Sequence, residues 1–485
     1  MPIFIYNSLT RKKEEFFPLK PSQVNIYTCG VTVYDESHIG HARSLYIFDV
    51  IRRYLKYRGF RVKFVRNITD IDDKIINRAN ELKTDWQELI KKYIQRYYED
   101  LDSLGIEKGD SEPRATENIP DMVSYIQNLI DKGYAYEAGG DVYFNVRKFS
   151  GYGKLSGQGI DQMENGVRIE PRELKKDPLD FALWKASKEN EPSWDSPWGK
   201  GRPGWHIECS VMSQKYLDTQ TLDIHAGGRD LIFPHHENEI AQSEAATGKP
   251  FAKYWIHHGL LTINTQKMSK SLGNFVTIKD FMSKYHDADL LKLFFLSAHY
   301  SHPIDYTEEK IEEVKKQKNN FNSFFGKVND WHLLKGKNKS VTSEQDRNKI
   351  ENICLSFQQV MDDDFNMPKG LACLFELMDL GYQFISLDKE EGFNYVKSKL
   401  EILLHIFGLE VPLKQVIPEN IKKMRMERDK AKENKDFQKA DEIRKEMSRF
   451  GYVASDTAGG TTITPIMYIP EESETGEDKK DGSSC

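Results

Sequence analysis

A strand–helix–strand pattern over residues 24–68 constrains the fold of this chain more than any other feature. A β-type run at 24–28 leads into a loop headed by Cys29, and apolar residues with helical spacing follow over 42–55. A second β-type run covers 62–68. This order predicts an α/β fold with a parallel sheet, and it places the loop at the carboxyl edge of the strands, where ligands collect.

Two histidines stand where the predicted helix begins, in the tetrad His38-Ile39-Gly40-His41. Backbone N–H groups and the helix dipole at such a position attract phosphate, and histidines three residues apart face the same side of a helix. Gly40 lets a flat ring approach the backbone. Taken alone, the tetrad is equally compatible with half-exposed loop histidines or with metal ligands.

A second motif, Lys-Met-Ser-Lys-Ser at 267–271, lies in a predicted loop far downstream. Alone it predicts only a basic loop. In this order, and flanking a strand–helix pattern, the two motifs resemble the HIGH and KMSKS signatures of class I aminoacyl-tRNA synthetases. The resemblance implies a Rossmann-like catalytic domain in which His38, His41, Lys267 and Lys270 carry the chemistry with ATP and Mg²⁺.

Composition sets the broader class of protein. A chain of 485 residues is too long for one compact core, so several domains are expected. Charged residues make up 30% of the chain, and the net charge of -6 argues against nonspecific coating of nucleic acid. No apolar run approaches the roughly 20 residues of a membrane span, and the N-terminus lacks a signal-peptide layout. We therefore expect a cytoplasmic protein without membrane contact. The five cysteines suggest no disulfide framework; they are Cys29, Cys209, Cys354, Cys373 and Cys485.

Two local patterns have simple structural interpretations. The glycine-rich stretch 150–157 opens no helix, so a flexible loop is favoured over a phosphate loop. A helical pattern over 84–104 begins with Thr84 and Gln87, which predicts a capping box. Neither pattern indicates chemistry.

Four further residues have side chains that bind metals: Cys29, Cys209, His235 and Glu239. His235 and Glu239 are four residues apart on one predicted helix face, so they can share an ion. Two thiolates, an imidazole and a carboxylate suit tetrahedral Zn²⁺. Spacing alone does not decide the matter, because a lone buried cysteine is more often a small hydrophobe. Cys354 and Cys373 take that simpler interpretation.

Longer motifs extend the resemblance to one branch of the class I synthetases. Residues 29–30, 66–74, 204–209, 234–239 and 435–441 resemble the cysteinyl-tRNA synthetase family, and the likeness spans residues 1–466. It implies that the four candidate ligands hold one zinc ion per chain, which binds the thiolate of the substrate L-cysteine. It also implies two contact sets. The cysteine and adenylate pocket would include Thr32, Thr69, Trp205 and Asp230. The nucleotide contacts would be His38, Gly40, His41, His225, Asp230 and Lys270. Ala226 departs from the family pattern, where a glycine is expected.

The resemblance also divides the chain. The implied fold is a Rossmann-like parallel-sheet catalytic domain with an inserted connective domain, followed by an α-helical bundle and a small mixed anticodon-binding domain. The expected boundaries are 1–120 and 200–260 for the two catalytic halves, 121–199 for the insertion, 261–310 for the KMSKS loop and stem-contact region, 311–412 for the bundle, 413–467 for the anticodon module and 468–485 for a disordered tail.

The implied function is ATP-dependent attachment of cysteine to tRNA(Cys) by a monomeric enzyme. Two alternatives remain open at this point. One is a sister ligase that joins cysteine to an amino sugar, which shares the signatures but lacks an anticodon module. The other is a non-catalytic tRNA- or zinc-binding relative, which predicts broken signatures.

Overall fold

The computed structural model describes residues 1–159, 174–269, 273–329, 341–411, 418–457 and 460–465. Backbone contacts divide the chain into two units. The first contains Met1–Ile311, Glu351–Glu376 and Lys399–Glu410, and the second contains Glu312–Ile350, Leu377–Ser398 and Val411–Cys485. Within the described residues, every helix is too short or too polar to cross a membrane. The finer division into domains stays a prediction.

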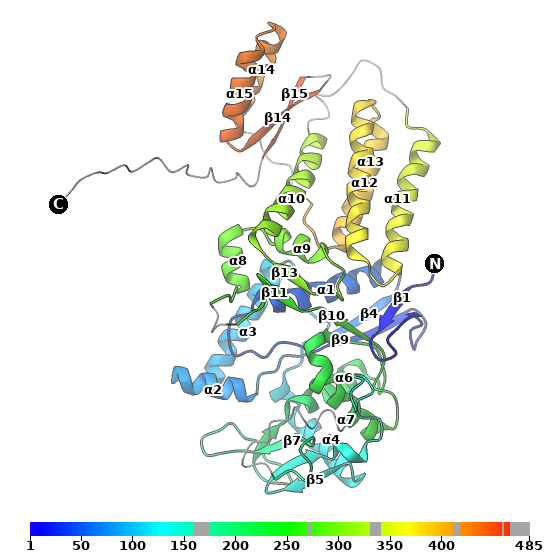
Figure 1. Cartoon of the computed structure of the whole chain (residues 1–485), viewed down its shortest axis with the longest axis vertical. Coiled ribbons are helices and arrows are strands. Elements are labelled where there is room, and N and C mark those ends of the chain that lie inside the picture. Colours follow the sequence, from blue (N-terminus) through cyan, green and yellow to red (C-terminus); the bar gives the residue numbers. More distant parts are fainter. Residues whose placement is uncertain (160–173, 270–272, 330–340, 412–417, 458–459, 466–485) are drawn as a thin grey trace, which may run out of the picture. The chain divides into compact units, whose positions relative to one another are not determined.

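A parallel four-stranded sheet forms the centre of the first unit (Figure 1). Its order is β10-β9-β3-β4, with bounds Ala252–His258, Leu222–Gly228, Gln23–Thr28 and Arg61–Arg66. Helix α1, Ile39–Tyr57, connects β3 to β4, as the sequence predicts. Strand β3 pairs with both β4 and β9, so the two halves of the chain meet inside one sheet.

Three helical segments flank strand β9 in the chain. Helix α6 covers Trp205–Leu217, η5 covers Ile232–His236 and α7 covers Glu237–Thr247. Helix α6 starts six residues before the predicted 211–217 segment, because Gly204 takes an extended conformation and serves as its N-cap. The early start places Cys209 on a helix beside α7.

Between β4 and β9 the chain forms a second sheet, antiparallel and ordered β5-β6-β7-β8, whose last strand lies just beyond the predicted insertion 121–199. Its strands share an apolar core with α4, α6 and α7 that includes Phe144, Trp184 and Met212. Helix α3 lies earlier in the chain, between β4 and the second sheet. Its N-cap residue is Asp85 and not the predicted Thr84. The bounds are β1 Phe4–Asn7, β2 Lys12–Glu15, α2 Asp73–Leu82, α3 Trp86–Ser103, η1 Ala115–Asn118, α4 Ile119–Asp131, β5 Ala135–Ala138, β6 Asp141–Phe144, η2 Val146–Lys148, β7 Phe181–Ala186 and β8 Gly201–Pro203.

A small three-stranded sheet follows β10 and carries the start of the second signature. Strand β11 pairs with both β12 and β13. The bounds in this region are η4 Arg229–Leu231, β11 Leu261–Ile263, β12 Gln266–Lys267, α8 Ile278–Tyr285, α9 Ala288–Leu296 and β13 Ile304–Tyr306.

Helices dominate the rest of the chain, as predicted. Amphipathic patterns at 307–331, 344–363, 369–387 and 393–407 predict four helices, and the structure has α10 Glu308–Asn329, α11 Glu344–Asp362, α12 Met367–Ser386 and α13 Glu390–Ile406. The last module pairs α14 Glu419–Glu433 and α15 Phe437–Arg449 with the hairpin β14 Tyr452–Thr457 and β15 Gly460–Pro465. Its core contains Ile421, Met447 and Ile463. The predicted tail at 468–485 lies outside the described residues.

Candidate active site and metal cluster

The first signature caps helix α1 with imidazole side chains. His38 is the N-cap residue, and its Nδ1 accepts hydrogen bonds from the backbone N–H groups of Gly40 at 3.1 Å and His41 at 3.3 Å. His41 Nδ1 accepts from the His38 N–H at 3.2 Å. The two rings stack with centroids 3.7 Å apart. A β-carbon on Gly40 would lie 2.8 Å from His38 Cε1, so the stack depends on glycine.

These bonds determine where the imidazole protons are. An Nδ1 that accepts a hydrogen bond carries no proton, so the neutral ring must carry it on Nε2. Burial, with His38 and Lys74 nearby, holds the pKa of His41 well below its usual value. His41 is therefore neutral at pH 7 and presents an Nε2–H donor.

Backbone hydrogen bonds bring the second signature beside the first. The Ile39 N–H donates to the Val276 carbonyl at 3.1 Å, and the Ile278 N–H donates to the Ser37 carbonyl at 2.9 Å. Met268 approaches Gly40 closely enough that a β-carbon there would lie 3.6 Å from its Cε. The two motifs, distant in sequence, thus form one site.

Asn274 closes the loop of the second signature. Its Oδ1 accepts from the Ser269 N–H at 2.8 Å, and its Nδ2 donates to the Lys267 carbonyl at 3.2 Å. Lys267 is exposed at the end of β12. Lys270 lies outside the described residues.

The four predicted metal ligands converge. One donor atom from each of Cys29, Cys209, His235 and Glu239 lies within 4.8 Å of the other three. The Cys209 Sγ is 3.6 Å from His235 Nε2, and the Cys29 Sγ is 3.5 Å from Glu239 Oε1. His206 Nδ1 lies 2.9 Å from His235 Nδ1, which orients the opposite nitrogen toward the cluster. Outer hydrogen bonds of this kind fix the orientation of metal-binding imidazoles.

The charges of the cluster suit a cation. Burial raises the pKa of Cys209, but hydrogen bonds from Cys29 and His235 outweigh it and lower that pKa to about 6. Burial also opposes ionisation of Glu239, yet His225 and His235 hold its pKa well below the usual range. Burial lowers the pKa of His235, but Glu239 and Cys209 outweigh it and raise that pKa to about 10. A proton on His235 therefore balances part of the negative charge, and a divalent cation would take the place of that proton.

A second set of possible ligands shares two members with the first: Cys29, His225, His236 and Glu239. His225 was expected to contact ATP, but it is fully buried. Its Nδ1 lies 3.2 Å from the Tyr27 carbonyl oxygen, and its Nε2 is bonded to Glu239 Oε2. Both ring nitrogens are therefore occupied within the protein, and the expected nucleotide contact is not supported by this geometry.

The predicted cysteine pocket lies beside the cluster. Thr32 and Thr69 are paired by a parallel β-bridge. The Thr69 hydroxyl donates to Glu208 Oε2 at 2.8 Å and accepts from Asn67 Nδ2 at 3.2 Å. Gly30 approaches Asn67 so closely that a β-carbon would lie 1.5 Å from its carbonyl oxygen. These contacts place Thr69 between the two halves of the sheet.

Trp205 and Asp230 lie at the exposed side of the site. Trp205 is 37% exposed, and its ring stacks on His235 with centroids 4.1 Å apart. Asp230 is exposed, and its carboxylate folds over Gly228, where a β-carbon would lie 2.3 Å from Oδ1. Trp205 therefore lies against one candidate ligand, and the role predicted for both side chains in the cysteine pocket stays a prediction.

Several polar residues of the site were not predicted from the sequence. His206 and His236 stand next to predicted residues in the motifs 204–209 and 234–239, and that adjacency was the available signal. Asn67 and Glu208 also lie within the motifs 66–74 and 204–209, whereas His257 lies in none of the motifs and acts through a partner elsewhere in the sequence. That partner is His236, whose Nδ1 lies 2.8 Å from His257 Nε2.

Known proteins share both the sequence and the fold. Residues 15–316 match the tRNA synthetases class I (C) catalytic domain, and residues 356–409 match the DALR domain. A "Cysteine--tRNA ligase" of Geobacillus thermodenitrificans is 50% identical over 464 residues, which cover 95% of this chain and 98% of the relative. The protein of the same name from Persephonella marina is 49% identical over 488 residues, covering 95% and 99%.

Solved structures with lower identity share the fold. Mycobacterium tuberculosis methionyl-tRNA synthetase in complex with methionyl-adenylate has a TM-score of 0.58 at 15% identity, over 79% of this chain and 89% of its own. A putative arginyl-tRNA synthetase from Campylobacter jejuni has a TM-score of 0.57 at 14% identity, over 82% and 96%. With both signatures and the ligand cluster in place, the chain belongs to the cysteine--tRNA ligase family of class I tRNA synthetases.

Proposed function

We propose that this chain ligates L-cysteine to tRNA(Cys) through a cysteinyl-adenylate, with ATP as the second substrate. The observation that carries the proposal is the meeting of three elements at the carboxyl edge of one parallel sheet. They are the His38–His41 pair, the second signature beside it, and a cluster of two thiols, an imidazole and a carboxylate. The first two suit a nucleotide triphosphate, and the third suits a sulfur-containing substrate.

Cys29, Cys209, His235 and Glu239 would hold one zinc ion. This set is favoured over the alternative because it offers two thiol ligands, which zinc prefers. Bound zinc would take the substrate sulfur as a thiolate and so distinguish cysteine from serine. His225 then has a positioning role, because its bond to Glu239 directs that carboxylate.

Adenylate formation requires positioning and charge stabilisation more than covalent chemistry from the protein. The cysteine carboxylate attacks the α-phosphorus of ATP, and pyrophosphate leaves with Mg²⁺. His38 and His41 donate Nε2–H groups to phosphate oxygens. Lys267 and Lys270 meet the negative charge that develops on pyrophosphate. The terminal ribose hydroxyl of the tRNA then attacks the acyl carbon, and AMP leaves.

The pocket residues orient the amino acid. Trp205 stacks on His235, and Thr69 is bonded to Glu208 next to Cys209, which supports a role for these two, together with Thr32 and Asp230, in contacting the cysteine and its adenylate. Glu208 and Asn67 fix the Thr69 hydroxyl from behind through bonds of 2.8 and 3.2 Å.

The C-terminal module supports tRNA over an amino sugar as the acceptor. The module is present here, and the relatives named for ligation to tRNA match this chain over almost their whole length. We propose that this module reads the anticodon and that the enzyme works as a cytoplasmic monomer. The described cysteines are all free thiols, which agrees with a reducing compartment.

The test is pyrophosphate exchange with each of the standard amino acids, followed by charging of purified tRNA(Cys). Exchange should depend on cysteine, and charging should need both cysteine and tRNA(Cys). Exchange with another amino acid at a comparable rate, or transfer of cysteine to an amino sugar in place of tRNA, would overturn the proposal.

A further inference from the structure

The glycine-rich stretch 150–157 encloses an anion that belongs to the protein itself. The Glu237 carboxylate accepts from the Gly153 N–H at 2.9 Å through Oε1, and from Leu155 and Ser156 at 3.1 and 2.8 Å through Oε2. Glu237 is fully buried. Successive backbone N–H groups form anion-binding concavities. The stretch is thus built like a phosphate loop, but a carboxylate fills it.

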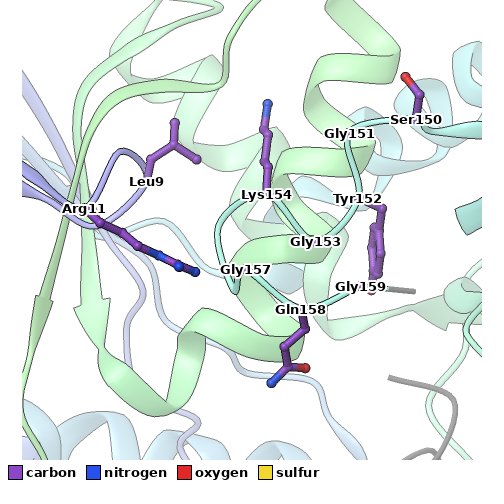
Figure 2. Close-up of a pocket in the computed structure, with 10 residues that line it drawn as sticks. All are labelled: Leu9, Arg11, Ser150, Gly151, Tyr152, Gly153, Lys154, Gly157, Gln158 and Gly159. Carbon is purple, nitrogen blue, oxygen red and sulfur yellow. The ribbon is translucent and has the colours of Figure 1, made fainter. Parts of the chain in front are cut away.

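Further contacts hold the same loop against helix α7. The Tyr152 hydroxyl donates to Asn238 Oδ1 at 2.5 Å, and Lys154 Nζ lies 2.5 Å from Glu244 Oε2. Figure 2 shows the loop from Ser150 to Gly159 with Arg11 beside it, around an open pocket of about 520 Å³. Arg11 Nη2 donates to the Ser156 carbonyl at 3.1 Å. The loop is therefore anchored on both sides.

The anchored segment also carries two candidate metal ligands. Glu237 stands two residues after His235 and two residues before Glu239. Residues two apart on a helix point to opposite sides, so the N-terminal turn of α7 lies between the loop on one side and the cluster on the other. A shift of that turn would move Glu239 away from Cys29.

We propose that Glu237 and Tyr152 are positioning residues of the metal site, through which the inserted domain holds the His235–Glu239 segment in its binding geometry. The inference rests on the proposed zinc site. It gives a role to two features that the proposed function leaves unused, the glycine-rich loop and the middle residues of the 234–239 motif.

The test measures zinc affinity directly. Glu237→Gln keeps the size of the side chain but places an amide N–H₂ against one of the three N–H donors. Tyr152→Phe removes only the hydroxyl. Lys154→Ala is the matched control, because it breaks a contact between the same loop and the same helix at Glu244, more than a turn from Glu239. Each holoprotein competes for zinc with a chromophoric chelator at equilibrium, and KM is measured for cysteine and for ATP.

Loss of a residue that orients a metal ligand costs about 10–100-fold in metal affinity. We expect a loss of that size in Glu237→Gln, a smaller loss in Tyr152→Phe, and none in Lys154→Ala. KM for cysteine should rise in the same order while KM for ATP stays constant. If both variants bind zinc like the wild type, and differ only in thermal stability, the inference is overturned and the metal site stands. If the wild-type protein itself holds no zinc, the proposed metal site falls, and this inference with it.

Discussion

Arg43 Nη1 donates to the carbonyl oxygen of Gly259 at 2.8 Å, with its side chain fully buried. The same guanidinium bonds to the carbonyls of Leu260, Tyr300 and His302 at 2.8, 3.2 and 2.6 Å. Arg43 lies on helix α1, two residues after the first signature. Its partners lie at the start and at the end of the segment that carries the second signature, so one side chain ties the two motifs together.

Arg43→Lys should slow cysteine activation. A lysine ammonium has three donors and no planar fork, so it cannot serve four carbonyls in this arrangement. The Leu260 and Tyr300 carbonyls also accept from the Ile304 and Gly259 N–H groups. The cost therefore arises where a carbonyl loses its donor, as at His302, and amounts to about 1–3 kcal/mol, which urea unfolding would detect. In pre-steady-state kinetics, the rate of adenylate formation should fall while cysteine binding is retained. Lys56→Ala, on the same helix but at the surface, is the control. An unchanged adenylate rate in a destabilised variant would show that Arg43 only supports the fold.

Lys270→Ala should lower the rate of adenylate formation far more than it weakens cysteine binding, since the charge matters most in the transition state. Rapid quench gives the rate, and equilibrium dialysis gives the cysteine affinity. Equal losses in the two quantities would contradict the assigned role.

Removal of residues 415–485 should leave cysteine-dependent pyrophosphate exchange nearly intact and impair charging of tRNA. The adenylate chemistry needs the parallel sheet and its two signatures, whereas the module from α14 to β15 has its own small core. Circular dichroism would confirm that the shortened chain is folded. Normal charging by that chain would show that the module does not recognise tRNA.

Cys209→Ser should lose both zinc and the preference for cysteine over serine. Without metal, the pocket must separate the two amino acids by size alone, and a difference of one small group gives only about 1–3 kcal/mol. In the wild type, X-ray absorption at the zinc edge should show one additional sulfur ligand when cysteine is added. If the number of sulfur ligands stays constant, the zinc does not bind the substrate and has only a structural role.

Asp100 should make stability depend on pH between about 4 and 6. Burial raises the pKa of this carboxyl to about 6; Arg96 opposes the rise, and Glu36 and Glu99 add to it. Because the folded pKa exceeds the unfolded value, the stabilising contribution is complete below pH 3.8 and disappears as pH rises through 6. The free energy of unfolding of Asp100→Asn, measured relative to that of the wild type, should therefore be roughly 1–2 kcal/mol higher at pH 7.5 than at pH 4.5. Urea titrations at the two pH values measure this difference, and a constant gap between the proteins would refute it.

Local periodicity was sufficient to predict β3, α1 and the four long helices after residue 307. It failed where a helix end depends on a residue without a capping side chain, as at Gly204, and where neighbouring polar residues compete, as at Thr84 and Asp85. Such boundaries are settled by tertiary contacts that a local pattern does not contain.

The metal cluster shows a different limit. Cys29 and Cys209 lie 180 residues apart, and their spacing carries no information. Resemblance to a family identified the four ligands, but not the residues that support them. The resemblance also implied that His225 contacts ATP, whereas in the structure this buried residue of β9 is bonded to Glu239. Pairings of this kind form only when β3 and β9 meet.

The adjacency of β3 and β9 also has a consequence for synthesis of the chain. Strand β3 ends at Thr28 and β9 begins at Leu222, so at 5–20 residues per second the ribosome needs about 10–40 s to deliver the partner. During that interval one edge of β3 exposes its backbone N–H and C=O groups, which invites aggregation. The insertion is made in the same interval. The cluster of Cys29 with Cys209, His235 and Glu239 therefore cannot assemble until residues 1–239 have left the ribosome.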